Sequence, residues 1–171
     1  MNNRTLKALT IAKNIDKDLP QRYVPPSLGT SPRSEMVLPH SLVRGTRGYI
    51  ERVVKQINGS YENGWYDACA VMMRRLIETL IIECFEYYNI AGNIKNQNGD
   101  FYFLSDLINR TLNETCWNLG RNTKRSLPKL KDIGDQSAHS RRFNAVREDI
   151  DKIIPQFRTV AQELIYLANF K

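Results

Sequence analysis

The 171-residue chain has no long hydrophobic stretch: its longest unbroken apolar run, residues 68–73, has six residues. A helix that spans a bilayer needs about 20, so a membrane-spanning protein is excluded. The first eighteen residues intersperse Lys and Arg among short apolar pairs and lack the apolar core of a secretory signal. We therefore expect a cytoplasmic protein that has no membrane partner.

Cysteine and histidine are scarce, with three Cys, no Cys-x-x-Cys pair and two His. These are too few ligands for a structural zinc site, and we expect neither a metal nor a cofactor. Cys69 and Cys84 fall in one predicted helix, where fifteen residues at about 1.5 Å each place them about 22 Å apart, too far for a disulfide. We expect all three cysteines, Cys116 included, to be small buried hydrophobic residues in a reducing compartment.

Positive charge is in excess, with 25 Lys and Arg against 18 Asp and Glu, a net charge of +7. Two segments carry nearly all of it. Residues 1–34 have a net charge of +4, and residues 121–147 hold eight basic and two acidic residues, a net charge of +6. A basic cluster of this kind is typical of a protein that binds a polyanion such as RNA, although charge alone fits a solvated surface equally well.

Proline is concentrated near the N-terminus: five of the seven prolines lie between residues 19 and 45, with Gly, Ser and Thr among them. This composition predicts an extended arm over residues 1–37, and helical spacing over residues 5–15 predicts a short helix within it. The compact domain is expected over residues 38–171. An arm of this kind offers a docking segment for a partner protein.

Apolar residues recur at helical spacing through the remainder of the chain. The spacing predicts a helix over residues 46–58, with Thr46 as its cap and Gly59 as its end. The longest periodic segment, residues 65–88, has apolar side chains over about half of its circumference. We expect this helix at the centre of the fold, with neighbours on two flanks.

Three more helices are predicted after residue 100. The first follows Asp100, and the second is a short helix over residues 129–135 with Pro128 in its first turn. The last begins after Asn144 and is kinked or split at Pro155, because proline lacks the N–H that the helix ladder needs. Together these patterns predict an all-α bundle of four to five helices.

The sequence has no Gly-rich phosphate loop and no serine-hydrolase, zinc-protease or kinase motif. The segment with residue types suited to phosphodiester chemistry is residues 131–139 (KDIGDQSAH), which overlaps the end of the short predicted helix and supplies the basic loop expected before the last one. Gly134 permits a tight turn there, and Asp135 and Ser137 are placed to orient the imidazole of His139. Alternatively, Asp135 and Ser137 cap the chain and His139 makes a structural hydrogen bond between helices.

Two separated motifs carry a likeness to a known family: Arg-Arg-x-x-Glu within residues 60–86 (SYENGWYDACAVMMRRLIETLIIECFE), and Gly-x-x-x-x-His within residues 131–139. With the amphipathic last helix, they resemble the domain-of-unknown-function 4145 family, a branch of the HEPN superfamily, over residues 38–168. The resemblance implies a HEPN-like bundle that forms a homodimer through its long helices. It also implies a family of stand-alone proteins, or of domains attached to restriction and other defence enzymes of bacteria and phage.

Many HEPN proteins are metal-independent endoribonucleases in which an Arg and a His, separated by four to six residues, line a dimer cleft. By this resemblance His139 is the catalytic acid or base, assisted by Lys131 and by Glu78. No Arg stands at the matching positions here, and Lys131, with seven residues between, is the nearest upstream cation. Lys holds a phosphate as a point charge, without the bidentate grip of Arg. The other cations expected to bind nucleic acid are Arg75, Lys124, Arg125, Lys129, Arg141 and Arg142.

The sequence leaves two functions open. In the first, a HEPN-like defence or regulatory module binds RNA or a nucleotide through the basic segment and cleaves RNA with His139. In the second, a non-catalytic dimerising adaptor domain binds a partner protein, and His139 is structural.

Several side chains also have two interpretations. Glu78 either faces the cleft or forms an ion pair with Arg74 or Arg75 on its own helix. Trp65 and Trp117 either stack on bases or belong to the hydrophobic core.

Overall fold

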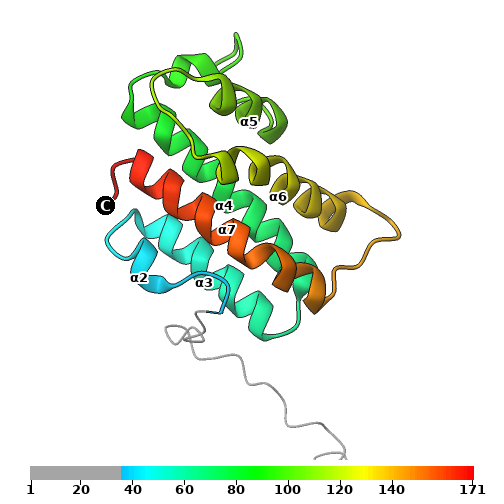
Figure 1. Ribbon diagram of the computed structural model, residues 1–171. Coiled ribbons are helices and arrows are strands. Elements are labelled where there is room, and N and C mark those ends of the chain that lie inside the picture. Colours follow the sequence, from blue (N-terminus) through cyan, green and yellow to red (C-terminus); the bar gives the residue numbers. More distant parts are fainter. Residues whose placement is uncertain (1–35) are drawn as a thin grey trace, which may run out of the picture. The chain divides into compact units, whose positions relative to one another are not determined.

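The computed structural model describes residues 36–171, so the predicted N-terminal arm lies almost entirely outside the described residues. Within residues 36–171 there are six α-helices, one short 3-10 helix and no β-strand, which confirms the all-α prediction (Figure 1). The elements are α2 (His40–Val43), α3 (Gly48–Glu62), α4 (Tyr66–Tyr87), η1 (Ala91–Ile94), α5 (Leu104–Asn113), α6 (Arg121–His139) and α7 (Arg147–Leu167). Helix α2 is a single turn that the sequence pattern did not predict.

Helix α4 lies at the centre, packed against α3, α6 and α7 (Figure 1). The Asp67 carboxylate, at its start, accepts a hydrogen bond from the N–H of Ala145, just before α7. Near its end, the Cys84 thiol donates to the carbonyl of Leu164. Helix α7 therefore runs parallel to α4, and α6, which ends six residues before Ala145, runs antiparallel to both.

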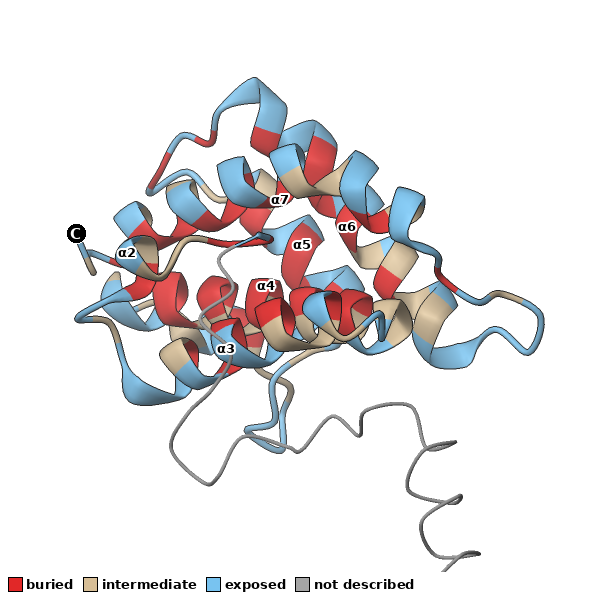
Figure 2. Cartoon of the chain, turned by 90° about the horizontal axis from the view of Figure 1, so that it is seen from below, coloured by how far each residue is buried: buried red, intermediate tan, exposed pale blue. Residues whose placement is uncertain are grey.

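The core is built on the wide apolar face of α4, as the sequence predicted (Figure 2). Burying each large apolar side chain contributes about 1.5–3 kcal/mol, so this face holds the four long helices together. Although α4 has 22 residues, no helix of residues 36–171 is both long and apolar enough to cross a membrane. The α4 residues that are at most 1% exposed are Cys69, Ala70, Met73, Leu76, Ile77, Leu80, Ile81, Cys84 and Phe85.

The first described residues are fastened to α3 by a buried asparagine. The side-chain oxygen of Asn58 accepts hydrogen bonds from the N–H groups of Val37 (3.1 Å) and Leu38 (3.0 Å), and its amide donates to the carbonyl of Leu38 (2.8 Å). Arg158 of α7 donates to the carbonyl of Val37. Because Val37 is as fully buried as Leu38, the packed domain includes Val37, one residue before its predicted start.

Helices α3 and α7 differ from the predictions at three of their ends. Helix α3 starts at Gly48 rather than Thr46, whose hydroxyl instead donates to the carbonyl of Val43. It also continues through Gly59 to Glu62, because buried residues on both sides of that glycine keep the helix against the core. Helix α7 starts three residues after Asn144, where the Asp149 carboxylate accepts a hydrogen bond from the backbone N–H that precedes the helix.

Neither internal proline breaks its helix. Pro155 lies inside α7, which runs unbroken from Arg147 to Leu167, so of the two predicted alternatives, a kink or a split, the split does not occur. Pro155 is exposed, while Phe157, Val160 and Ala161 are fully buried after it and Ile150 before it. The packing of both halves against the core therefore outweighs the one backbone hydrogen bond that proline removes.

Candidate nucleic-acid interface

The predicted catalytic loop is part of a helix. Residues 131–139 are the last turns of α6, and this helix begins at Arg121, well before the predicted start at residue 129. Its buried side carries Thr123, Ser126, Leu127, Leu130 and Gly134 at helical spacing. The apolar pattern was weak because two of these buried positions are polar and one is glycine, so the segment was predicted too short.

Gly134 serves close packing rather than a tight turn. A Cβ atom at this position would lie 2.6 Å from Cβ and 2.9 Å from Cδ of Arg74 on α4. Only a residue without a side chain lets the two helices approach this closely. Gly134 therefore positions α6 and its side chains against α4.

Four cations occupy the solvent-facing side of the first half of α6: Arg121, Lys124, Arg125 and Lys129, which we call the α6 basic face. All four are exposed, and none forms a side-chain hydrogen bond or an ion pair within residues 36–171. Arg121, Arg125 and Lys129 repeat every four residues, so they lie along one side of the helix. The next acid along α6 is the exposed Asp132, which lies 3.8 Å from Lys131. At the start of the helix, the Glu163 carboxylate of α7 accepts hydrogen bonds from the Gly120 N–H and the Thr123 hydroxyl. The predicted site omitted Arg121, although its four-residue spacing from Arg125 was visible in the sequence.

The α6 basic face borders a groove between α6 and α7. The groove has a volume of about 340 Å³, and Arg125 and Lys129 lie in its wall. It has no acidic lining residue, and neutral hydrogen-bonding groups complete it. This combination of two cations with amides and hydroxyls suits a phosphate and the polar edge of a nucleotide. The other lining residues are Asn122, Ser126, Pro155, Gln156 and Thr159.

His139 ends α6 and is exposed, as are Arg141 and Arg142 in the loop that follows. None of these three side chains forms a hydrogen bond or an ion pair with any described residue. The hydroxyl of Ser140 accepts hydrogen bonds from the backbone N–H groups of Arg142 and Phe143, which shapes the start of the loop. The imidazole and the two guanidinium groups are therefore available to a ligand.

Lys131 and Asp135 belong to an ion-pair network between α6 and α4. Lys131 Nζ lies 2.6 Å from one Asp135 oxygen, and Arg74 Nε lies 2.6 Å from the other. Arg74 also reaches Glu78, with Nη1 3.4 Å from Oε2. Asp135 thus holds two cations rather than the imidazole of His139. The Arg74–Glu78 ion pair that the spacing allowed is present, while Arg75 is exposed and has no side-chain partner among the described residues.

This network makes stability depend on pH. Partial burial by itself raises the pKa of the Asp135 carboxyl, but the hydrogen bonds from Lys131 and Arg74 outweigh it and hold the pKa below its ordinary value of 3.8. A carboxyl group whose pKa is lowered by folding stabilises the folded state at pH values above its ordinary pKa. This contribution is lost as the pH falls through the lowered pKa of the folded state. We expect Asp135→Asn to cost about 1 kcal/mol of unfolding free energy near neutral pH and clearly less at about pH 3, because the contribution declines as the pH falls below 3.8 and disappears only below the lowered pKa.

Thermal melts of both proteins across this pH range measure the effect. Asp132→Asn is the matched control, because it removes the same charge from the same helix at a side chain that is 65% exposed. A melting-temperature gap between wild type and Asp135→Asn that stayed constant from neutral pH to about pH 3 would contradict the assignment.

Ser137, predicted to orient His139, has a buried hydroxyl with no hydrogen-bond partner in the described part of the chain. It therefore makes no hydrogen bond to the imidazole within one chain.

The two tryptophans that were predicted either to stack on bases or to belong to the core differ from each other. Trp117 is buried and packs edge-on against Phe85 and Tyr88, whereas Trp65 is 58% exposed. Trp117 thus belongs to the core and Trp65 does not.

Residues 36–171 contain no group of three or more His, Cys, Asp or Glu side chains that is able to hold a metal. Cys69 and Cys84 are buried, and burial raises the pKa of both thiols to about 12, so they stay protonated. Cys116 is exposed, contrary to the expectation that the cysteines are buried. The chemistry available at this surface is therefore that of cations, hydroxyls, amides and one imidazole.

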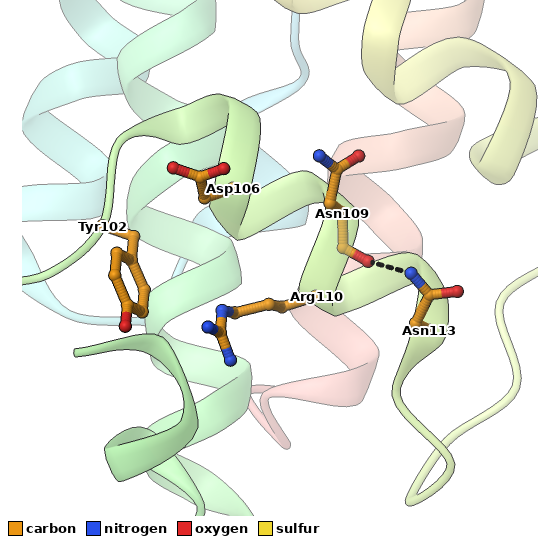
Figure 3. Close-up of a pocket in the computed structure, with 5 residues that line it drawn as sticks. All are labelled: Tyr102, Asp106, Asn109, Arg110 and Asn113. Atoms are coloured by element: carbon orange, nitrogen blue, oxygen red, sulfur yellow. Dashed lines mark hydrogen bonds between the residues drawn. The ribbon is translucent and has the colours of Figure 1, made fainter. Parts of the chain in front are cut away.

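A second hollow, of about 440 Å³, lies beside α5 (Figure 3). Its one cation, Arg110, is placed over the ring of Tyr102, with 4.5 Å from Cζ to the ring centroid. Asp106 also lines it, together with Asn109 and Asn113. Because one acid and one base balance each other there, this hollow lacks the excess positive charge of the α6 basic face.

Comparisons of the chain with protein-family models, with curated proteins and with solved structures found no match. The function is therefore inferred from the charges and geometry of this surface and from the resemblance in the sequence.

Proposed function

We propose that this chain is a HEPN-like module that binds RNA, or a nucleotide, through the α6 basic face. The observation that carries the proposal is a row of four exposed cations without carboxylate partners among the described residues. Arg121 and Lys129 are eight residues apart, about 12 Å along the helix axis. A row of this length matches consecutive phosphates, and each contact releases a condensed counterion.

The HEPN-like part of the proposal is supported by the contact between its two motifs. Arg74, in Arg-Arg-x-x-Glu, packs against Gly134, in Gly-x-x-x-x-His, and binds Asp135 within the same motif. The two motifs are about sixty residues apart in the chain but adjacent in the bundle. A role in bacterial or phage defence is proposed on the resemblance alone.

We propose that any RNA cleavage is carried out by a homodimer of the chain. In such a reaction the ribose 2′-hydroxyl gives its proton to water as its oxygen attacks the adjacent phosphorus. The bond from phosphorus to the 5′-oxygen breaks, and His139 supplies the proton that the leaving oxygen takes up, so the products are a 2′,3′-cyclic phosphate and a 5′-hydroxyl. Lys131 is bound to Asp135 and lies about 12 Å from His139 along the helix axis. The group that grips the phosphate beside His139 must therefore come from Arg141, Arg142 or a second copy of the chain.

The second candidate is a non-catalytic dimerising adaptor domain, and the outer side of α4 favours it. Between the buried faces of this helix runs a strip of residues that are exposed or half-buried, with two large apolar side chains in it. The same strip on a second copy would cover them. The strip consists of Ala68, Met72, Arg75, Thr79, Ile82 and Glu86. Docking of a partner protein by the arm concerns residues outside those described.

The dependence of RNA affinity on salt tests the proposed function. If the four cations neutralise four phosphates of a single strand, affinity should fall about 50-fold between about 50 and 200 mM salt. Fluorescence anisotropy of a labelled single-stranded RNA of about ten nucleotides measures it. An affinity that changed less than about twofold over this range would exclude phosphate binding as the main function and favour the adaptor domain.

His139→Ala separates cleavage from binding. Since the imidazole is exposed and has no partner in residues 36–171, the melting temperature and the RNA affinity should stay nearly unchanged. Any cleavage seen in the presence of a chelator should disappear. Retained cleavage would exclude His139 as the acid or base, and a clear drop in melting temperature would favour the structural interpretation.

A further inference from the structure

The end of the bundle at which α6 finishes carries an exposed tryptophan. Trp65 directly precedes α4, and 58% of it is exposed, against 8% of Trp117. Exposure alone does not distinguish Trp65, because Phe103 and Tyr166 are 83% and 55% exposed. What distinguishes this indole is the positive charge at the same end of the bundle. The flat face of the indole suits stacking against another π-system.

The α6–α7 loop is fastened to this same end. The carboxylate of Asp67, two residues after Trp65, accepts the hydrogen bond from the N–H of Ala145 at 2.9 Å. Arg141 and Arg142 precede Ala145 by four and three residues, so their Cα atoms lie within about 15 Å of it. Two exposed arginines and an exposed tryptophan thus share one end of the molecule.

Three carboxylates at this end are engaged internally, whereas Glu62 and Glu148 are exposed. Asp67 binds the loop, Asp149 caps α7, and Asp151 accepts a hydrogen bond from Tyr61 and lies 3.5 Å from Arg147. Arg141 and Arg142, by contrast, have no partner among the described residues. The loop therefore presents two guanidinium groups that have no ion-pair partner in residues 36–171 to an anionic ligand.

The α6 basic face leads to this end. His139 follows Arg121 by eighteen residues, five full turns at 3.6 residues per turn, so both lie on the same side of α6. A strand whose phosphates follow Arg121, Arg125 and Lys129 is thereby directed past His139 towards the loop and Trp65.

We propose that Trp65 stacks on an unpaired base of a single-stranded nucleic acid whose phosphates are held by the α6 basic face and by Arg141 and Arg142. This inference rests on the proposed function and specifies its ligand. Stacking on an exposed indole requires a base that is free of its neighbours, so a duplex of equal charge lacks this contact.

Titrating the full chain with an oligouridylate of about ten nucleotides, and with a hairpin duplex of equal length, tests the inference. Trp65→Ala should weaken binding of the single strand about tenfold and leave the duplex unaffected. The single strand should quench tryptophan fluorescence in the wild type but not in Trp65→Phe, which retains only the buried Trp117. Phe103→Ala is the matched control, because Phe103 is an aromatic residue that is 83% exposed, at the start of α5.

The outcomes distinguish failure of the stacking inference from failure of the proposed RNA binding. If the single strand binds in a salt-dependent way and Trp65→Ala binds it as tightly as the wild type does, the stacking inference falls and RNA binding stands. If neither nucleic acid binds, both fall. A change of oligomeric state in Trp65→Ala, seen by light scattering with RNA affinity unaltered, would show that Trp65 belongs to a protein interface and would overturn the inference. Unchanged melting temperatures establish that the variants are folded.

Discussion

Replacing Arg125 and Lys129 together by Glu is expected to weaken binding of single-stranded RNA about 30- to 100-fold at low salt. Each exposed cation–phosphate contact contributes about 1 kcal/mol, and reversing the charges adds repulsion, for a total of about 2–3 kcal/mol. The loss should be smaller at high salt, because two fewer phosphates release counterions. Anisotropy titrations at several salt concentrations measure both the affinity and its salt dependence.

The matched control is the double variant Arg52→Glu and Lys55→Glu on α3. Both residues are exposed and without a side-chain partner in residues 36–171, and the net charge changes by the same amount. The control should lose only the small, long-range part of the attraction. Equal losses in the two double variants would mean that net charge, rather than the α6 basic face, attracts the RNA.

Gly134→Val is expected to lower the free energy of unfolding by about 3 kcal/mol. Helix propensity alone predicts the opposite sign, since glycine is the less favourable residue inside a helix. The difference comes from Arg74, because a Cβ at position 134 would lie 2.6 Å from the Arg74 Cβ, which belongs to the rigid base of that side chain. The substitution must therefore push α6 away from α4 and strain the Arg74–Asp135 ion pair. Urea denaturation measures the loss.

Gly48→Val provides the comparison for this variant. Gly48 starts α3, and a Cβ there would meet nothing within 4 Å. Its unfolding free energy should change by less than about 1 kcal/mol. If Gly134→Val were as stable as Gly48→Val, the close approach of α4 and α6 would not depend on the glycine.

Helical periodicity predicted the parts of the fold in which the buried face is apolar. The central position of α4 followed from its wide apolar arc, which the structure confirms. Helix α6 was predicted too short because Thr123, Ser126 and Gly134 occupy its buried side, where an apolar pattern was sought. Of the kink or split predicted at Pro155, the split does not occur, because packing on both sides of the proline outweighs the one backbone hydrogen bond that it removes.

The candidate site shows the same division. The sequence located the positive charge, since residues 121–147 carry a net charge of +6. It was unable to tell a free cation from a paired one. Lys131 and Arg125 are both basic residues of the same segment. Lys131, however, is bound to Asp135, which also binds Arg74 of α4, whereas Arg125 is exposed.

By itself, then, the sequence determined an all-α domain and the segment where its positive charge is concentrated, because helical spacing and charge are properties of neighbouring residues. Only the tertiary structure decided which cations remain free, that Gly134 is a packing residue, and that Trp65 is exposed while Trp117 is buried. Each of these depends on which residues of one helix lie opposite those of another. Arg74 and Asp135, which lie opposite each other, are 61 residues apart along the chain. A pattern of neighbouring residues does not extend that far.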